Sequence, residues 1–476
     1  MKTKRFLLDN DTSNIIHRLG DDVSGAVEEA VRECPPNVTT YLFCSGAGTC
    51  YWPTKIGYVD SRAEGLLAAQ KRGLDPLRML LEGMKQSGKE TFITYRMNDV
   101  HNPTDATQWN TPRIRREHPD CIVGMDEVKA GNAGWMSYCM DYTRNDVRQY
   151  VLSLIREQIS LYGGVIDGFQ LDWMRFPRHL SGNPEEVWAK RSIITEFMSQ
   201  VRSILDESGN KILLSARIPT SPAGCRMLGF DIQEWTEQGL IDLLVICPFL
   251  TTEWSIPFNE FRYLLKGKEI PVYGGFDCGF GKQKHFPESL RGICSSLYDC
   301  GADGIYIFNF PCWTEYIAAR PYHWLCGLDE PETVSAKPLL FAVEHAHNRI
   351  PGTDQKASLP ASFPDKGMLS FPIRIPAAAL PAWRGMILVH SHGNIRLSVN
   401  GCSVNEVYLN GTSVYRSEIF MEFTDHYFNK AVRPVSEDCR LFRADPSCLK
   451  AGDNRLEIMN VSGKELEIER INLALW

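Results

Sequence analysis

The sequence predicts an α/β protein built as a (β/α)8 TIM barrel followed by an all-β sandwich domain. Over the first part of the chain, short apolar runs typical of buried strands alternate with amphipathic helical stretches, as in parallel sheets wound by helical crossovers. After Pro331 the helical periodicity ends, and short alternating runs with Asn-Gly turns at 400–401 and 410–411 indicate antiparallel strands. We therefore expect a barrel domain over residues 1–330 and a sandwich domain over residues 331–476.

Eight apolar runs are expected to form the barrel. They cover residues 5–9, 39–44, 91–97, 166–172, 211–217, 241–248, 271–277 and 304–309. The helix before the fourth strand is well marked, because apolar residues recur at helical spacing over 147–161. Thr143 and Asp146 match a capping box at its start. Further helices are expected over residues 76–85, 185–205 and 287–298.

The segment 98–138 is too long for a plain connection, and long loops of compact domains are commonly functional. We expect a short extra strand near its end, over residues 137–140. In the second domain, strands are expected over residues 395–399, 406–409, 455–459 and 465–475.

Composition excludes several classes of function. The chain has 476 residues, of which 23% are charged and 43% hydrophobic, as in ordinary globular proteins. Its net charge of −7 argues against nucleic acid or an anionic membrane as a partner. No apolar run approaches the roughly 20 residues that span a bilayer, and the first nine residues do not form a signal peptide. We expect a cytoplasmic protein, or an exported one if a leader was removed; the oligomeric state is left open.

The cysteines indicate buried thiols. There are 15 of them, an odd number without a Cys-x-x-Cys pair, so neither a complete disulfide framework nor a zinc ribbon is indicated. Several lie within apolar runs, among them Cys44, Cys139 and Cys247. A reducing compartment fits this pattern best.

The fourth predicted strand ends in a carboxylate. Extended geometry places Gly168, Gln170 and Asp172 on one face. The stretch resembles strand four of glycoside-hydrolase barrels, where the Val-Asp-Gly-Phe-Arg-Leu-Asp pattern of the α-amylase type ends in the nucleophilic aspartate. It is also similar to the Asp-Gly-x-Asp-x-Asp-x-Glu signature of chitinase-type enzymes, but Gln170 and Met174 replace the central Asp and the catalytic Glu of that signature. The resemblance implies a glycoside hydrolase with Asp172 as nucleophile or base. Residues 449–458 look like the last strands of jelly-roll domains that accompany sugar hydrolases.

Glycosidic cleavage uses two carboxyl groups. For the acid we favour Glu253, because it follows the sixth strand beside Trp254, an apolar neighbour able to raise its pKa. Asp277 competes, because it closes the seventh strand within a glycine-rich run that a substrate can approach. Alternatively, Asp172 is structural and caps the next loop or pairs with Arg175. If it is the nucleophile or base, replacing it by Asn should abolish turnover and leave folding nearly intact.

Other strand ends carry polar and aromatic residues suited to sugar hydroxyls and ring faces. The predicted substrate-binding residues are Asp9, Asn10, Arg96, Asn98, Asp99, His101, Trp173, Arg175, Arg217, Trp254, Asn309 and Trp313. At least one indole among Trp52, Trp109, Trp135, Trp173, Trp254 and Trp313 is expected to stack on a sugar. The three arginines either clamp a carboxylate or sulfate of the substrate or pair internally with Asp99, Asp172 or Asp277.

We predict no metal and no cofactor, since the first strand lacks a His-x-His pair and the glycines at 279–281 do not match a phosphate-binding loop. The sequence thus favours a glycoside hydrolase acting on an oligo- or polysaccharide. The alternatives are a non-catalytic carbohydrate-binding protein on the same fold, and a lyase or hydrolase acting on acidic or sulfated glycans.

Overall fold

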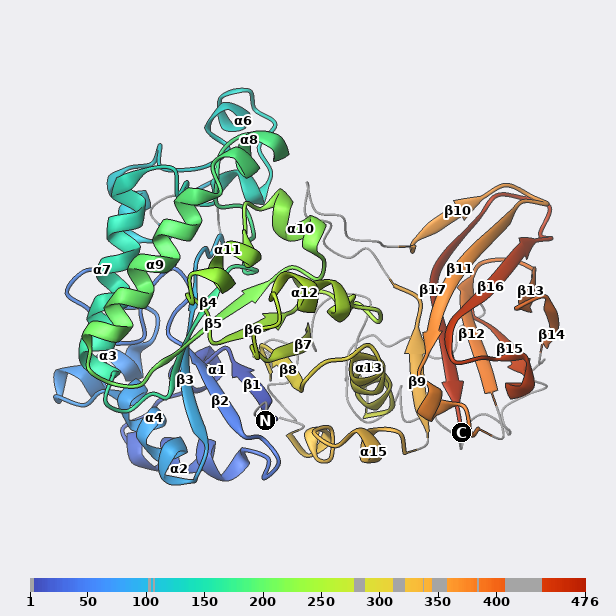
Figure 1. The fold of residues 1–476 in the computed structure, drawn as a ribbon, viewed down its shortest axis with the longest axis horizontal. Helices are drawn as coiled ribbons and strands as arrows, with labels where there is room; N and C mark the ends of the chain where they lie inside the picture. Colours follow the sequence, from blue (N-terminus) through green and yellow to red (C-terminus); the bar gives the residue numbers. More distant parts are fainter. Residues whose placement is uncertain are drawn as a thin grey trace.

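The computed structural model describes residues 4–101, 104–105, 108–277, 287–310, 322–336, 338–344, 358–382, 385–406 and 439–476. Within these residues it contains a closed eight-stranded parallel barrel and a nine-stranded antiparallel sheet, shown side by side in Figure 1. The predicted fold class, a (β/α)8 barrel followed by an all-β domain, is confirmed. The division of the chain between residues 330 and 331 stays a prediction.

The barrel strands follow one another in sequence order, and β8 pairs with β1 to close the ring. Their bounds are β1 Phe6–Asn10, β2 Thr40–Cys44, β3 Glu90–Arg96, β4 Gly168–Asp172, β5 Leu213–Ile218, β6 Leu243–Ile246, β7 Val272–Asp277 and β8 Ile305–Phe308. All eight lie within the predicted runs or shifted by one residue, because strands covered on both faces are continuous apolar runs. Only β6 is much shorter than predicted.

Helices cover the outside of the barrel (Figure 1). They are α1 Ser13–Ile16, α2 Val23–Glu33, α3 Glu64–Lys71, α4 Pro76–Gln86, α7 Asn145–Tyr162, α8 Pro184–Ala189, α9 Ser192–Glu207, α10 Pro222–Met227, α11 Ile232–Glu237, α12 Phe258–Leu264, α13 Pro287–Asp299 and α15 Pro331–Val334. In α4 the Asp75 carboxylate caps the first turn, Pro76 occupies its start, and Leu77, Leu80 and Leu81 are among the residues buried along one stripe. No helix among the described residues combines the length and apolarity needed to cross a membrane.

Two helical predictions are wrong in detail. Helix α7 begins at Asn145 without a side-chain cap, because the Asp146 carboxylate is held by Arg144, at 3.1 Å from Nε and 2.7 Å from Nη2. The helix predicted over 185–205 is two helices, α8 and α9, with Lys190 and Arg191 between them.

The predicted strand over 137–140 is also wrong. The segment after β3 instead forms the short helices α5 Arg113–Glu117 and α6 Met125–Lys129 and the 3-10 helix η1 Trp135–Tyr138. The Ser137 hydroxyl accepts a hydrogen bond from the Gly134 amide at 3.1 Å, which tightens this turn. Among the described residues of this segment, only an isolated bridge between Ile122 and Met140 is strand-like.

The second sheet has the order β10-β17-β12-β15-β14-β13-β16-β11, and β9 also pairs with β17. Its strands are β9 Leu339–Ala342, β10 Ala361–Phe363, β11 Met368–Ile375, β12 Gly385–Ser391, β13 Ile395–Val399, β14 Cys402–Glu406, β15 Cys439–Ala444, β16 Gly452–Asn460 and β17 Leu466–Leu475. Of the strand predicted over 406–409, Glu406 is the last residue of β14, and residues 407–409 lie outside the described residues. Short 3-10 helices are η2 Tyr322–Leu325, η3 Ala377–Ala379 and η4 Pro446–Cys448.

The second sheet packs on the barrel through β9, which lies against α13. A Cβ at Gly292 in α13 would come within 2.1 Å of the Leu340 carbonyl oxygen, so the close approach of helix and strand requires glycine there. Buried side chains of both sheets belong to one continuous hydrophobic cluster. Cys44, Cys139 and Cys247 are buried free thiols, as predicted.

Candidate active site

The C-terminal ends of the barrel strands carry a layer of buried charged side chains. Arg96 ends β3, Asp172 ends β4, and Arg217 lies near the end of β5. These three residues are Cα partners across the sheet, so strand alternation places their side chains on the same face. Asp9 in β1 and Asp277 at the end of β7 are buried as well. In parallel barrels this end of the strands is where active sites are built.

Asp172 is held by Arg217 and by the loop that follows it. Nη1 of Arg217 donates to both carboxylate oxygens, at 3.1 and 3.0 Å, and the Met174 and Arg175 amides donate to Oδ1 at 2.9 and 3.0 Å. The guanidinium carbon of Arg217 lies 3.6 Å from the centre of the Phe308 ring. Burial acts to lower the pKa of Arg217, but the combined effect of Asp172, Cys247, Tyr306 and Asp9 raises it above its ordinary value. The ion pair predicted for Asp172 thus forms with Arg217 and not with Arg175, and the carboxylate also caps the loop.

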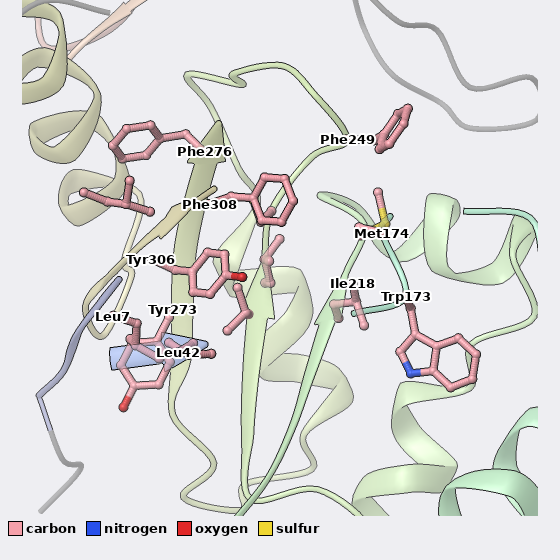
Figure 2. Packing of buried hydrophobic residues seen from close by; sticks show 14 of the residues in the cluster. Leu7, Leu42, Trp173, Met174, Ile218, Phe249, Tyr273, Phe276, Tyr306 and Phe308 are labelled. Carbon is pink, nitrogen blue, oxygen red and sulfur yellow. The ribbon is translucent and has the colours of Figure 1, made fainter. Parts of the chain in front are cut away.

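Asp9 lies in a different environment. The Tyr306 hydroxyl contacts its Oδ2 atom and lies 3.0 Å from Oε1 of Gln170 (Figure 2 shows this hydroxyl inside the barrel). Burial and, to a smaller extent, the charge of Asp172 raise the pKa of Asp9 to about 7, against the effect of the Tyr306 hydrogen bond. Around neutral pH this carboxyl group therefore keeps its proton in part of the molecules.

A second network joins the ends of β1, β3 and β4. Nη1 of Arg96 donates to Oδ2 of Asp99 at 2.9 Å, and Nη2 contacts the Asp11 carboxylate. His101 contacts the other oxygen of Asp99 through Nδ1 and lies 3.1 Å from Nη2 of Arg175 through Nε2. Burial acts to raise the pKa of Asp99, but His101 and Arg96 lower it well below its usual range. Asp99 is therefore an ionised partner of the residues around it.

Asp277 belongs to the same interior. Its amide donates to the Thr251 carbonyl at 3.3 Å and its carbonyl accepts from the Thr252 hydroxyl at 3.3 Å, which ties the loop after β6 to the end of β7. Burial raises the pKa of Cys247 to about 12; the Arg217 cation opposes this rise, and the charge of Asp277 adds to it. The charges of Asp277 and Arg217 therefore act on the same buried thiol, in opposite directions.

The position of Trp254 differs from the one predicted. Its backbone amide donates to Oε1 of Glu344 at 3.2 Å, and its ring is buried against Phe341 of β9, with centroids 6.1 Å apart. The second sheet covers the indole, so the structure replaces the predicted stacking role of Trp254 by a packing role. Glu253 is half-buried in the same loop.

Trp173 is part of the core. It is fully buried and makes edge contacts with Tyr142 and His179, at centroid distances of 5.7 and 4.9 Å. Figure 2 shows its ring directed away from Tyr306 and Phe308. A buried ring cannot stack on a sugar, so the stacking role predicted for Trp173 is replaced by a packing role.

The indole of Trp135 is accessible near the mouth. Trp135 is 58% exposed and its ring lies 6.0 Å from that of Phe176, which in turn lies 5.6 Å from the His101 ring. Trp52, by contrast, is buried. Trp313 lies outside the described residues.

Two of the predicted asparagines are occupied by the chain itself. Asn98 donates through Nδ2 to the Arg178 carbonyl at 3.1 Å and accepts from the Met140 amide at 2.8 Å, so it anchors the long loop after β3 instead of facing substrate. Asn10 donates to the Tyr41 hydroxyl at 2.7 Å and is fully buried. Both side chains therefore have partners within the chain.

Backbone strain gathers at the same end of the barrel. Thr12, Phe176, Leu250 and Asn309 follow β1, β4, β6 and β8, and all four have positive φ angles, of 65°, 50°, 48° and 58°. Such conformations cost free energy in residues other than glycine and are concentrated at functional sites. The side-chain oxygen of Asn309 also lies 3.4 Å from Nη2 of Arg96.

Sequence reasoning omitted three residues that complete the site. Asp11 was not chosen although it directly follows the first strand, and Gln170 and Tyr306 were not chosen because they lie within strands. Alternation offered a signal for Gln170, which shares its strand face with Asp172. No group of three or more His, Cys, Asp or Glu side chains that could hold a metal ion is found in the part of the chain that the structure describes.

Comparisons with known proteins give distant likenesses. No protein-family model and no curated protein matches the chain. Among solved structures, the glycoside hydrolase domain of PgaB (BpsB) from Bordetella bronchiseptica is 11% identical with a TM-score of 0.46, over 68% of this chain and 98% of that chain. α-L-Fucosidase isoenzyme 1 from Paenibacillus thiaminolyticus is 12% identical with a TM-score of 0.37, over 93% of this chain and 96% of that chain. Catalytic domain 2 of the group II chitinase from Ostrinia furnacalis is 8% identical with a TM-score of 0.32, over 58% and 64%. At these values a functional assignment has to come from the residues at the barrel mouth.

Proposed function

We propose that the chain is a glycoside hydrolase whose reaction takes place at the C-terminal mouth of the barrel. The observation that carries the proposal is the contrast between Asp9 and Asp172. Asp172 is ion-paired with Arg217, whereas burial and the neighbouring charge of Asp172 raise the pKa of Asp9 to about 7. Glycosidic cleavage needs one carboxyl group that gives a proton and one that is ionised.

In this proposal Asp172 is the nucleophile, or the base that activates water. Its Oδ1 atom accepts three hydrogen bonds, from two amides and from Arg217, whereas Oδ2 accepts one. The less occupied oxygen has lone pairs left for the sugar carbon or for water. The hydrogen bonds on Oδ1 fix the orientation of the carboxylate, which favours reaction in a single geometry.

We assign the proton donor to Asp9, with Asp277 and Glu253 as the other candidates. Asp9 has the raised pKa expected of a general acid. Asp277 has a suitable position, since it is buried at the end of β7. Glu253 is supported least, because the neighbouring indole expected to raise its pKa lies against the second sheet.

A carbohydrate-binding protein without hydrolytic activity is the second candidate. It is favoured by the same hydrogen bonds on Asp172, which are also those of a structural carboxylate. A hydrolase and a carbohydrate-binding protein would both bind sugar, but only the hydrolase would cleave it.

The test is to incubate the purified chain with a panel of oligosaccharides and aryl glycosides and to measure released sugars by chromatography. We expect release from at least one substrate and none from the Asp172→Asn variant. Asp167→Asn is the matched control, because Asp167 precedes the same strand at the opposite end of the barrel, where it binds Lys85 at 3.0 Å. Binding without release by the wild-type chain would support the second candidate. Loss of activity in both variants would indicate a general effect of substitution in β4.

We assign activity to the barrel, over residues 1–330, and a supporting role to the sandwich, over residues 331–476. What supports this division is that the charged layer comes from barrel strands, while β9 of the second sheet packs on the outer helix α13.

A further inference from the structure

The three arginines at the mouth differ in what neutralises them. Arg96 donates to Asp99 at 2.9 Å and contacts Asp11, and Arg217 donates to Asp172 at 3.0 Å. For these two, internal pairing is the observed arrangement. Arg175 differs: its nearest carboxylate oxygen, Oδ2 of Asp99, lies 3.9 Å from Nε, beyond hydrogen-bond distance.

Arg175 nevertheless is buried, with a residue exposure of 5%. Among the residues that the structure describes, its Nη1 atom has no hydrogen-bond partner, and Nη2 has His101 at 3.1 Å. Burying a cation and leaving its donors without acceptors is costly, and a guanidinium does not escape this cost by losing its proton. The arrangement is therefore incomplete without an acceptor from outside these residues.

His101 adds to this imbalance. A guanidinium nitrogen only donates, so Nε2 of His101 accepts from Arg175 and the imidazole proton lies on Nδ1, facing Asp99. Asp99 is already bound by Arg96 on its other oxygen. The ring thus contacts both Arg175 and Asp99, and it takes up the Asp99 oxygen that Arg96 leaves open.

Aromatic rings lie near the guanidinium group of Arg175. Its guanidinium carbon lies 5.0 Å from the centre of the Phe176 ring, which contacts both His101 and the exposed Trp135. Phe176 is itself buried, so of these two rings only Trp135 can meet a sugar ring, and a cationic donor with an exposed indole in its vicinity matches a sugar that carries an acidic substituent.

We propose that Arg175 forms a subsite for the acidic group, a carboxylate or a sulfate, of a sugar unit, and that the substrate of this chain is an acidic glycan. This inference rests on the proposed function in that it places the sugar at the same mouth. Both terminal nitrogens of Arg175 carry donors that can bind two oxygens of such a group side by side, and the exposed Trp135 ring packs against Phe176, the ring that borders the guanidinium.

The test measures binding, separately from turnover, by isothermal titration calorimetry with the full chain. Two matched pairs of probes are used: oligogalacturonate against its carboxyl-reduced counterpart, and carrageenan oligosaccharides against the same chains after desulfation. We expect one acidic probe to bind on the order of 10- to 100-fold more tightly than its neutral counterpart, since hydrogen bonds to a charged group are involved. The pair that shows the preference identifies the group as carboxylate or sulfate.

The preference should depend on Arg175. Arg175→Met should remove the preference, and Arg175→Lys should retain part of it, because a lysine keeps the charge and loses the paired donors. Arg202→Met is the control for the loss of one positive charge, since Arg202 lies on α9 and pairs with Asp206 and Asp242. The control should keep the full preference.

Equal binding of acidic and neutral probes by the wild-type chain would overturn the inference, whether or not the variants fold. So would a preference that Arg175→Met retains. Release of sugars without such a preference would leave the hydrolase proposal in place and remove the acidic subsite. A preference that depends on Arg175, without release of sugar from any substrate, would leave the acidic subsite in place and remove the hydrolase proposal.

Discussion

Replacing Asp172 by Asn should cost stability as well as activity. The sequence suggests a variant that folds nearly as well as the wild type, but Arg217 is fully buried and its only carboxylate within hydrogen-bond distance among the described residues is Asp172. Removing one partner of a buried ion pair costs about 3 to 5 kcal/mol, because the other charge stays buried without compensation. An asparagine keeps an oxygen for the Met174 and Arg175 amides, so we expect a loss of about 3 kcal/mol, at the lower end of that range.

A double-mutant cycle measures this pairing directly. Arg217→Met keeps a long unbranched side chain and removes the cation, and alone it should also destabilise by about 3 kcal/mol. In the double variant neither charge is left unpaired, so we expect a coupling free energy of about 2 to 3 kcal/mol. Denaturant unfolding followed by tryptophan fluorescence is a suitable assay, because the buried Trp173 directly follows Asp172.

Additive losses in the cycle, with a coupling below about 0.5 kcal/mol, would refute the ion pair as a source of stability. Turnover by Asp172→Asn at the wild-type rate would refute the reaction role of Asp172. The two readouts are separate, since the double variant is expected to lose about 3 to 4 kcal/mol, less than the sum of the two single losses, and to remain inactive.

The remaining predictions concern the acid, the stacking surface and the second sheet. Folding raises the pKa of Asp9 from its usual value near 3.8 to about 7. Asp9 therefore contributes stability, up to about 4 kcal/mol, that is fully present below about pH 4 and is lost as pH rises through 7. Asp9→Asn should flatten this part of a curve of unfolding free energy against pH. Among Asp9→Asn, Asp277→Asn and Glu253→Gln, the variant of the true acid should keep activity on aryl glycosides with good leaving groups and lose it on unactivated sugars, and rescue in a variant other than that of Asp9 would reassign the acid. Trp135→Ala should raise KM about tenfold without changing the unfolding midpoint, because the ring is 58% exposed; an unchanged KM would exclude it as a platform. A chain cut after residue 330 should be less soluble in a sedimentation assay, because it lacks β9, whose Phe341 ring packs against Trp254. Equal solubility would contradict this packing.

The eight barrel strands could be predicted because local apolar runs decide them, and the same alternation identified Asp172 as an inward carboxylate. The partner of Asp172 could not be predicted in this way. Arg175 is three residues away and was an obvious choice, but Arg217 is the Cα partner on the next strand, and only strand register reveals that. The local sequence does not determine which residues lie opposite one another on neighbouring strands.

The tryptophans show a second limit. Trp254 follows a strand end, where a substrate-binding indole is expected. It is covered by Phe341 of β9, a strand about 90 residues further along the chain. Whether an aromatic residue in a loop is exposed depends on what packs over it, and that is decided by tertiary structure. The failed capping box at α7 is the local version of the same problem, since Arg144 competes for the Asp146 carboxylate.

The position of β17 has a consequence for the order in which the molecule can be completed. This strand, Leu466–Leu475, pairs with β9, β10 and β12, and β9 is the strand that covers α13. During synthesis, β9 emerges about 120 residues before its partner, a delay of roughly 6 to 25 s at ordinary elongation rates. Over that interval the barrel can close, but β9 has no neighbouring strand and the apolar side of α13 lacks its finished cover. A nascent chain of this protein therefore exposes the unpaired edges of β9 at a stage when its barrel strands are already made.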